Sequence, residues 1–285
     1  MTGSRAFTLI ELIVCIAITA TLIGLLLPGL GAARESARSG VCSSNARQLA
    51  LANDLYANDQ RDAYAPGAAD FNANLSRWHG SRVSPSAAFA PAGGALTPYL
   101  DSSGSNSTSG VRECPSFSRS REELARLRLG FERSAGGYGY NNAFAGSVRA
   151  RAPDGLSWVI VTDRSGSPRT RFESPARTAA FSDAAMACEP GVGGVIEYSF
   201  LEPRRWPENP YQPADPSVHF RHASGGWRGA RFSRGGTAAV AWLDGHATLE
   251  GMTTSTRNNA YGVDPSAASV GWFGDSDDDS LMDYK

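Results

Sequence analysis

The sequence is poor in lysine, in cysteine and in net charge, and the last two shortages exclude classes of protein. Of 27 basic residues only Lys285 is lysine, a bias that we interpret as a coding preference for arginine and not as a binding signal. The net charge of -1 supplies no basic field that would attract nucleic acid, so we expect no nucleic-acid partner. The four cysteines form no C-x-x-C pair, which excludes a zinc ribbon and a thioredoxin-like motif.

Catalytic fingerprints are also missing. The chain has no G-x-S-x-G, H-E-x-x-H, P-loop or dinucleotide-binding pattern, so we do not expect an enzyme. It has 285 residues, with 31 Gly and 16 Pro, which predicts a loop-rich globular protein large enough to bury a core.

What the chain does have is one long apolar run, from Phe7 to Leu30, in which Glu11 is the only charged residue. As a helix this run spans about 36 Å, enough to cross a bilayer. Three hypotheses compete: a secretory signal peptide cut near residues 31–33, a plain signal anchor, and a prepilin-type leader. The first two leave Glu11 unexplained, because a carboxylate in the bilayer is costly.

The third hypothesis accounts for the acid. The stretch AFTLIE, residues 6–11, resembles the G-F-T-L-I-E signature of type IV prepilins and pseudopilins. The resemblance implies that a prepilin peptidase cuts between Ala6 and Phe7 and that the new amino group of Phe7 is methylated. It also implies that Glu11 pairs with the N-terminal amine of a neighbouring subunit. The alternative is an interfacial Glu11 that reaches out to water. Ala6 departs from the signature, where Gly is usual.

The helix is expected to continue beyond the membrane. Pro28 lies 21 residues after Phe7, a spacing at which pilin-like helices carry proline, and it allows a kink. Residues 31–60 place Cys42, Leu49, Ala52 and Tyr56 on one helical face. Leu51 and Leu55 are expected to widen that apolar face. The same stretch resembles an A-R-x-x-A-R-x-x-x-C-x-x-N-x-x-Q pattern in bacterial prepilin-cleaved proteins, on which Cys42, Asn45 and Gln48 fall.

The remainder of the chain has short apolar runs between Gly, Ser and Pro. Residues 158–163, 178–186, 194–201 and 237–252 are predicted strands. Residues 120–131 are a predicted short helix with Ser120 as N-cap and Glu123 completing a capping box. The predicted fold class is α+β: a leader (residues 1–6), a long pilin-like helix whose first half spans the membrane (7–62), and a β-rich, loop-heavy head (63–285).

Two short motifs in the head resemble elements of the same bacterial group. Cys114 stands in the C-P-S element of VRECPSF, where the following proline favours an extended segment that would be stapled to Cys42. A disulfide between them and a buried free thiol are both open. The second motif, GGYGYNN at 136–142, is interpreted as a structural turn, because its glycines permit positive φ.

A group of histidines raises the question of a metal. His222 and Asp244-Gly245 resemble the H-X9-DG element of the group, but here 21 residues separate them instead of nine. One interpretation gathers His219, His222, Asp244 and His246 into a zinc site or a metal-dependent enzyme. The other has Asp244-Gly245 turning a hairpin that a His–Asp hydrogen bond pins.

The acidic C-terminal tail, residues 271–285, also has two interpretations. Alternating oxygen ligands from Asp275, Asp277 and Asp279 suit calcium, and the major pseudopilin of type II secretion, which binds calcium in a C-terminal loop, adds to that view. A solvated acidic tail is the alternative. No other cofactor is expected.

Taken with the resemblance, these features predict a structural pseudopilin-like subunit of a type II secretion or type IV pilus-like system. Its partners would be prepilin peptidase, other pilin-like subunits and an inner-membrane assembly platform. It would be a single-pass protein of the bacterial inner membrane with a periplasmic head. The alternatives are a membrane-anchored periplasmic binding module and, third, a metal-dependent enzyme.

Overall fold

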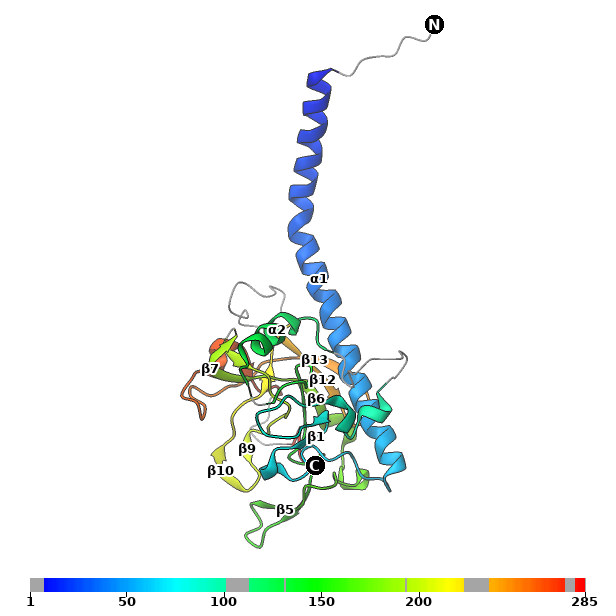
Figure 1. Cartoon of the computed structure of the whole chain (residues 1–285), viewed down its shortest axis with the longest axis vertical. Helices are drawn as coiled ribbons and strands as arrows, with labels where there is room; N and C mark the ends of the chain where they lie inside the picture. The colour runs from blue at the N-terminus through cyan, green and yellow to red at the C-terminus, as the bar shows by residue number, and fades with distance from the viewer. Residues whose placement is uncertain are drawn as a thin grey trace.

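The computed structural model describes residues 8–100, 113–130, 132–192, 194–222, 236–274 and 280–284. A single long helix, α1 (Leu9–Asp59), leads into a head built of short strands, as Figure 1 shows. The predicted α+β class, a long N-terminal helix followed by a strand-rich head, is therefore confirmed.

The centre of the head is an antiparallel sheet in the order β13-β12-β6-β3. Its strands are β3 (Tyr138–Tyr140), β6 (Ala179–Asp183), β12 (Thr237–Trp242) and β13 (Ala247–Gly251). The second half of α1 packs against β12, β6 and β13 of this sheet.

Among the described residues, the head also contains five two-stranded sheets. The pairs are β1 (Ser76–Arg77) with β2 (Gly80–Ser81), β4 (Val148–Arg151) with β5 (Trp158–Thr162), β7 (Met186–Val192) with β8 (Val195–Ile196), β9 (Arg205–Trp206) with β10 (Asn209–Pro213), and β11 (Val218–His219) with β14 (Val270–Gly271). Short 3-10 helices lie between them: Phe71–Ala73, Pro91–Gly93, Thr97–Tyr99, Arg169–Arg171, Pro175–Arg177 and Pro265–Ala268. Every predicted strand segment contains at least one of the observed strands.

Strands β3, β6 and β12 of the central sheet are buried on both faces, whereas the edge strand β13 is partly exposed. Side chains alternate between the two faces along each strand. On β12, Ala239 and Ala241 belong to the core shared with α1, whereas Val240 and Trp242 belong to a second core on the opposite face. The second core also contains Phe220, Trp272 and Phe273, among others. The near-continuous apolar run of β12 follows from this double burial.

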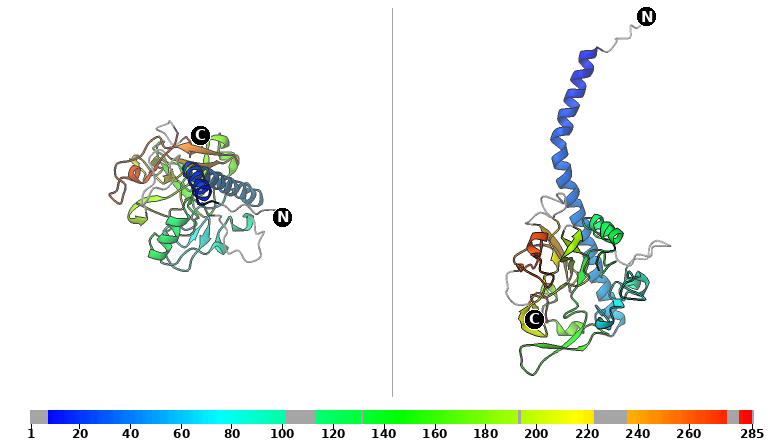
Figure 2. Two further views of the ribbon diagram at one scale, coloured as in Figure 1. Left: turned by 90° about the horizontal axis from the view of Figure 1, so that it is seen from above. Right: turned by 60° about the vertical axis from the view of Figure 1, so that its left-hand side comes forward.

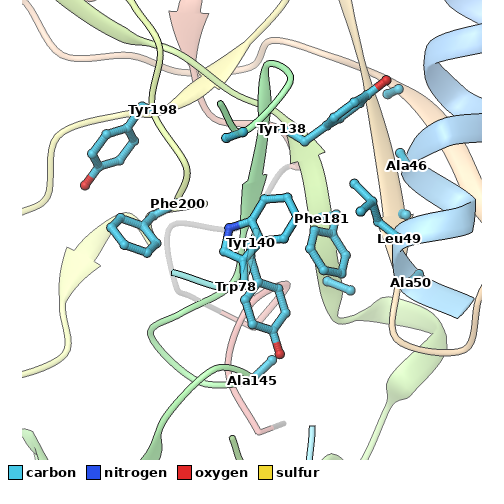
Figure 3. Close-up of a cluster of buried hydrophobic side chains, with 14 of the residues drawn as sticks. Ala46, Leu49, Ala50, Trp78, Tyr138, Tyr140, Ala145, Phe181, Tyr198 and Phe200 are labelled. Carbon is cyan, nitrogen blue, oxygen red and sulfur yellow. The ribbon is translucent and has the colours of Figure 1, made fainter. Parts of the chain in front are cut away.

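Small residues bring α1 close to the sheet. Ala46, Leu49 and Ala50 of the helix face an aromatic cluster in which the rings of Tyr140 and Phe181 stack at 4.6 Å, as Figure 3 shows. The expected widening of this helical face is wrong: Leu51 and Leu55 are 44% and 51% exposed. The buried stripe on this half of α1 contains Cys42, Leu49 and Ala52.

The second helix begins earlier than predicted. Helix α2 (Ser118–Leu127) has Phe117 at its N-cap position and no side-chain cap, so the predicted capping box of Ser120 and Glu123 is wrong. Ser120 is instead buried within the helix. Phe117, at the N-cap position, and Leu124 both belong to the buried core.

Candidate functional site

The apolar half of α1 is not buried against the rest of the described protein. Every described side chain from residue 8 to residue 34 is exposed. Figure 1 and the right-hand view of Figure 2 show this half projecting from the head. By length and composition, α1 is the one helix among the described residues that can cross a membrane. The helix continues through Pro28, and Figure 1 shows α1 changing direction between its projecting half and the half against the head.

At the start of the helix, Glu11 takes part in a capping box. The backbone N–H of Thr8 donates to Glu11 Oε2 at 2.8 Å, and the backbone N–H of Glu11 donates to Thr8 Oγ1 at 3.2 Å. This reciprocal cap satisfies two backbone donors at the helix start. Sequence reasoning missed it, although the T-x-x-E spacing at residues 8–11 is its signature. Ala6 and Phe7, the predicted cleavage and methylation positions, lie outside the described residues.

The helix is joined covalently to the head at Cys42, the first fully buried residue along α1. A disulfide joins Cys42 to Cys114, with their Cα atoms 5.0 Å apart. One helical turn further on, Asn45 Nδ2 donates to the carbonyl oxygen of Glu113 at 3.2 Å. The cysteine and asparagine of the sequence pattern thus fasten the helix to the segment around Cys114.

The C-P-S-F segment, which begins at Cys114, makes further contacts between the helix and the head. Ser116 Oγ donates to Glu35 Oε1 on α1 at 2.8 Å. Phe117 lies under the Arg221 guanidinium, which is 4.4 Å from the centre of its ring. The motif therefore joins the helix, the loop and the head in one place, which is a structural role.

Beside the disulfide lies His222, held between two carboxylates. Its Nε2 is 2.9 Å from Asp183 Oδ2, and its Nδ1 is 3.4 Å from Glu35 Oε1. Burial by itself would lower the pKa of His222, but the charge of Asp183 and the hydrogen bonds to both carboxylates raise it to about 9. In the same way, burial opposes ionisation of Asp183, yet the charges of His222 and Arg221 hold its pKa below the usual range. His222 is therefore protonated at neutral pH.

Asp183, Glu35 and Arg221 were not predicted to belong to any site. The available signal for Asp183 was a single acid within a predicted apolar strand, since a buried charge needs a partner. No signal in the sequence connects Glu35 with His222, because 187 residues separate them.

The predicted histidine set does not come together. Among the described residues, the one group of three or more His, Cys, Asp or Glu side chains close enough to hold a metal is Cys42, Cys114, Asp183 and His222, and of the predicted set it includes only His222. His219 packs on the Phe117 ring. His246 pairs with Asp244 at 2.6 Å on the exposed turn of the β12–β13 hairpin, where Gly245 has φ +88°.

The backbone pairing at the two ends of the inserted loop between His222 and Asp244 keeps the sheet intact. The backbone N–H of His222 donates to the Thr237 carbonyl at 2.9 Å, and the backbone N–H of Thr237 donates to the His222 carbonyl at 2.6 Å. The two residues that flank the insertion are therefore paired with each other. Residues 223–235 themselves lie outside the described residues.

The C-terminal tail returns into the head. Met282, Asp283 and Tyr284 are buried, and the Asn141 side chain donates to the Met282 carbonyl at 2.7 Å. A fully solvated tail is therefore wrong for residues 282–284. Asp275, Asp277 and Asp279 lie outside the described residues, so calcium binding stays a prediction, which a calcium titration of thermal stability tests.

An exposed apolar N-terminal helix fastened to a strand-rich head is the architecture expected of a pilin-like, single-pass membrane protein. Residues 1–27 match the family model of the prokaryotic N-terminal methylation motif, which is typical of prepilin-like pilins and pseudopilins. This match confirms the prepilin-type resemblance of the N-terminus; it does not extend to the H-X9-DG element. Comparisons with curated proteins and with solved structures gave no match.

Proposed function

We propose that this chain is a structural, non-enzymatic subunit of a type II secretion or type IV pilus-like assembly. A prepilin peptidase of the bacterial inner membrane cuts it before Phe7, and its head faces the periplasm. The observation that supports this most is the methylation motif at residues 1–27, which opens a helix whose apolar half has no partner among the described residues. Such a half can be covered by lipid first and by other pilin-like helices, on an inner-membrane assembly platform, later.

The mature N-terminus tests the processing step. Mass spectrometry of the full-length protein from a host with a prepilin peptidase should find a chain that begins at N-methylated Phe7. An intact Met1, or a new end near Ala33, would contradict the proposal and restore the signal-anchor or signal-peptide hypothesis.

The charge of Glu11 tests the assembly step. Glu11→Gln keeps a side chain that can complete the capping box but removes the negative charge. We expect it to insert normally and to lose incorporation into the assembly. Thr8→Ala is the matched control, because it removes the hydroxyl that accepts the Glu11 backbone N–H and keeps the carboxylate, and it should assemble.

The same pair of variants distinguishes the structural subunit from the alternative function. A membrane-anchored periplasmic binding module would use the helix only for placement, so Glu11→Gln would leave it fully functional. Crosslinking between neighbouring helices measures assembly. Crosslinked chains that form in the wild type and in Thr8→Ala but not in Glu11→Gln support the structural subunit.

A further inference from the structure

The junction between helix and head gathers four metal-binding side chains: Cys42 of α1, Cys114, Asp183 of β6 and His222. Each contributes one ligand atom, these atoms all lie within 4.8 Å of one another, and all four residues are buried. The two sulfurs are joined as a disulfide in this structure.

We propose that reduction of the Cys42–Cys114 disulfide turns this cluster into a zinc site of two thiolates, one imidazole and one carboxylate. The protein would then have two interchangeable fastenings between helix and head, a disulfide under oxidising conditions and a zinc ion under reducing ones. This inference is independent of the proposed function, because it concerns only the junction.

The distances suit a tetrahedral ion. With Zn–S near 2.3 Å and Zn–N and Zn–O near 2.0–2.2 Å, neighbouring ligand atoms in a tetrahedron stand about 3.3–3.8 Å apart. Cys114 Sγ already lies 3.9 Å from His222 Nε2. Opening the disulfide lets the two sulfurs separate toward that spacing, and Nε2 of His222 and the carboxylate of Asp183 move apart by a few tenths of an ångström.

The surroundings would orient the ligands. Glu35 faces the other ring nitrogen of His222, the carboxylate–histidine arrangement that fixes a metal-bound imidazole. Asp183 Oδ2 accepts the Ala239 backbone N–H at 2.7 Å, while Asp183 Oδ1 is buried without a hydrogen-bond partner among the described residues. The carboxylate can therefore offer an oxygen to the ion while its orientation is kept.

The charges also balance. Two thiolates and the carboxylates of Asp183 and Glu35 exceed the two positive charges of zinc by two. The Arg221 guanidinium lies beside Asp183, with Nε 3.8 Å from Oδ1, and Arg38 Nη1 lies 3.6 Å from Glu35 Oε2. In the oxidised protein, His222 Nε2 lies 2.9 Å from Asp183 Oδ2. Zinc would replace this direct contact between His222 and Asp183.

The redox step needs a dithiol reductant. The dithiol gives two electrons and two protons to the disulfide and is itself oxidised to a disulfide, which leaves two thiols on the protein. Zinc binding then releases both thiol protons, together with the Nε2 proton of an imidazolium at His222.

The experiment uses the full-length protein in detergent micelles, oxidised or reduced by a dithiol under anaerobic conditions. Thiol titration checks the state: all four cysteines react when reduced, and only Cys15 and Cys188 are free when oxidised. After removal of the reductant and incubation with Zn²⁺, elemental analysis should find one zinc per chain in the reduced sample and none in the oxidised one. Co²⁺ should give the same difference, with a thiolate charge-transfer band and the absorption of a tetrahedral ion.

Variants identify the ligands. His222→Gln should weaken zinc binding at least tenfold, and Glu35→Gln should weaken it about 10–100-fold through the orientation of His222. His246→Gln is the matched control, since His246 also pairs with an aspartate but on the exposed hairpin, and it should bind like wild type. Cys188→Ser controls for the remaining thiol.

Two results would overturn the proposal. One is equal zinc content in reduced and oxidised protein, whether or not the reduced chain keeps its tryptophan fluorescence. The other is a Co²⁺ spectrum in His222→Gln that matches that of wild type, because thiolates alone would then hold the ion.

Discussion

At the scale of single residues, several buried charged groups in the head pair with specific partners. Arg77 Nε donates to both oxygens of Glu132 at 3.0 Å, and Ser199 Oγ donates to the same carboxylate at 2.8 Å. Asp183 is matched to His222 in the same manner. Removing one member of such a pair leaves an uncompensated buried charge, which typically costs about 3–5 kcal/mol.

Tyr140 offers a test of this matching at a neutral group. Its hydroxyl donates to the Ala65 carbonyl at 3.0 Å and accepts from Asn53 Nδ2 at 3.1 Å, so it ties β3 to the end of α1. Tyr140→Phe should lower the free energy of unfolding by about 1–3 kcal/mol, because two buried groups lose their partner. Chemical denaturation measures this. The exposed Tyr211→Phe is the control, and equal losses in both would contradict the prediction.

Glu202 predicts a pH dependence. Burial raises its pKa to about 7, and its carboxyl accepts a hydrogen bond from the Tyr198 hydroxyl at 2.6 Å. The folded protein thus binds a proton at Glu202 that the unfolded chain, with a pKa near 4.5, has released. Its contribution to stability is complete below pH 4.5 and is lost as the pH rises to about 7.

Glu202→Gln isolates that contribution, because it keeps the shape and cannot ionise. Denaturation curves between pH 4.5 and 7 should show the wild type losing about 1–3 kcal/mol relative to the variant. Parallel pH profiles for the two proteins would show that Glu202 titrates normally.

At the scale of elements, the β12–β13 hairpin shows how local and tertiary signals agree. Asp244-Gly245 lies between the paired strands, Gly245 has φ +88°, and Asp244 Oδ1 accepts the His246 backbone N–H at 3.1 Å. The aspartate and glycine therefore serve the turn, as the hairpin interpretation holds, and His246 is the residue that precedes β13.

Gly245→Ala tests the turn. A Cβ at φ +88° is strained and would lie 3.2 Å from Leu51 Cδ2 of α1. We expect a loss of about 1–3 kcal/mol in the free energy of unfolding. Gly251→Ala on β13, where a Cβ meets nothing within 4 Å, is the control. A loss no larger than that of the control would argue against the strained turn.

At the scale of the whole molecule, the Cys42–Cys114 disulfide closes a separation of 72 residues between helix and head. In the chain-entropy model such a loop contributes about 4 kcal/mol. Replacing both cysteines by alanine should reduce the free energy of unfolding by about 2–4 kcal/mol. Thermal unfolding of the full-length chain measures it, with Cys188→Ala as control; an unchanged melting temperature would contradict it.

The C-terminal residues 282–284 are buried in the head. The Tyr284 ring packs on Phe144, Trp158 and Phe172 with centroids 5.1–5.3 Å apart. Tyr284→Ala should cost about 3–5 kcal/mol of stability, whereas the half-exposed Tyr261→Ala should cost much less. A variant as stable as wild type would mean that the tail is solvated in solution.

Local chemistry was enough to predict much of this protein. The apolar run with one acid, the helix that follows it, the strand segments and the Asp-Gly turn all depend on neighbouring residues, so they can be read from a single sequence. The N-terminal signature is local too, since AFTLIE is a continuous stretch.

Tertiary structure alone decided which distant groups meet. Glu35, Cys114, Asp183 and His222 lie on four separate segments, and only the packing of α1 on the central sheet brings them to one place. The same packing separates His222 from His246, exposes Leu51 and Leu55, and buries Tyr284. Which face of a helix is covered depends on the width and position of its neighbours, and those are properties of the folded chain.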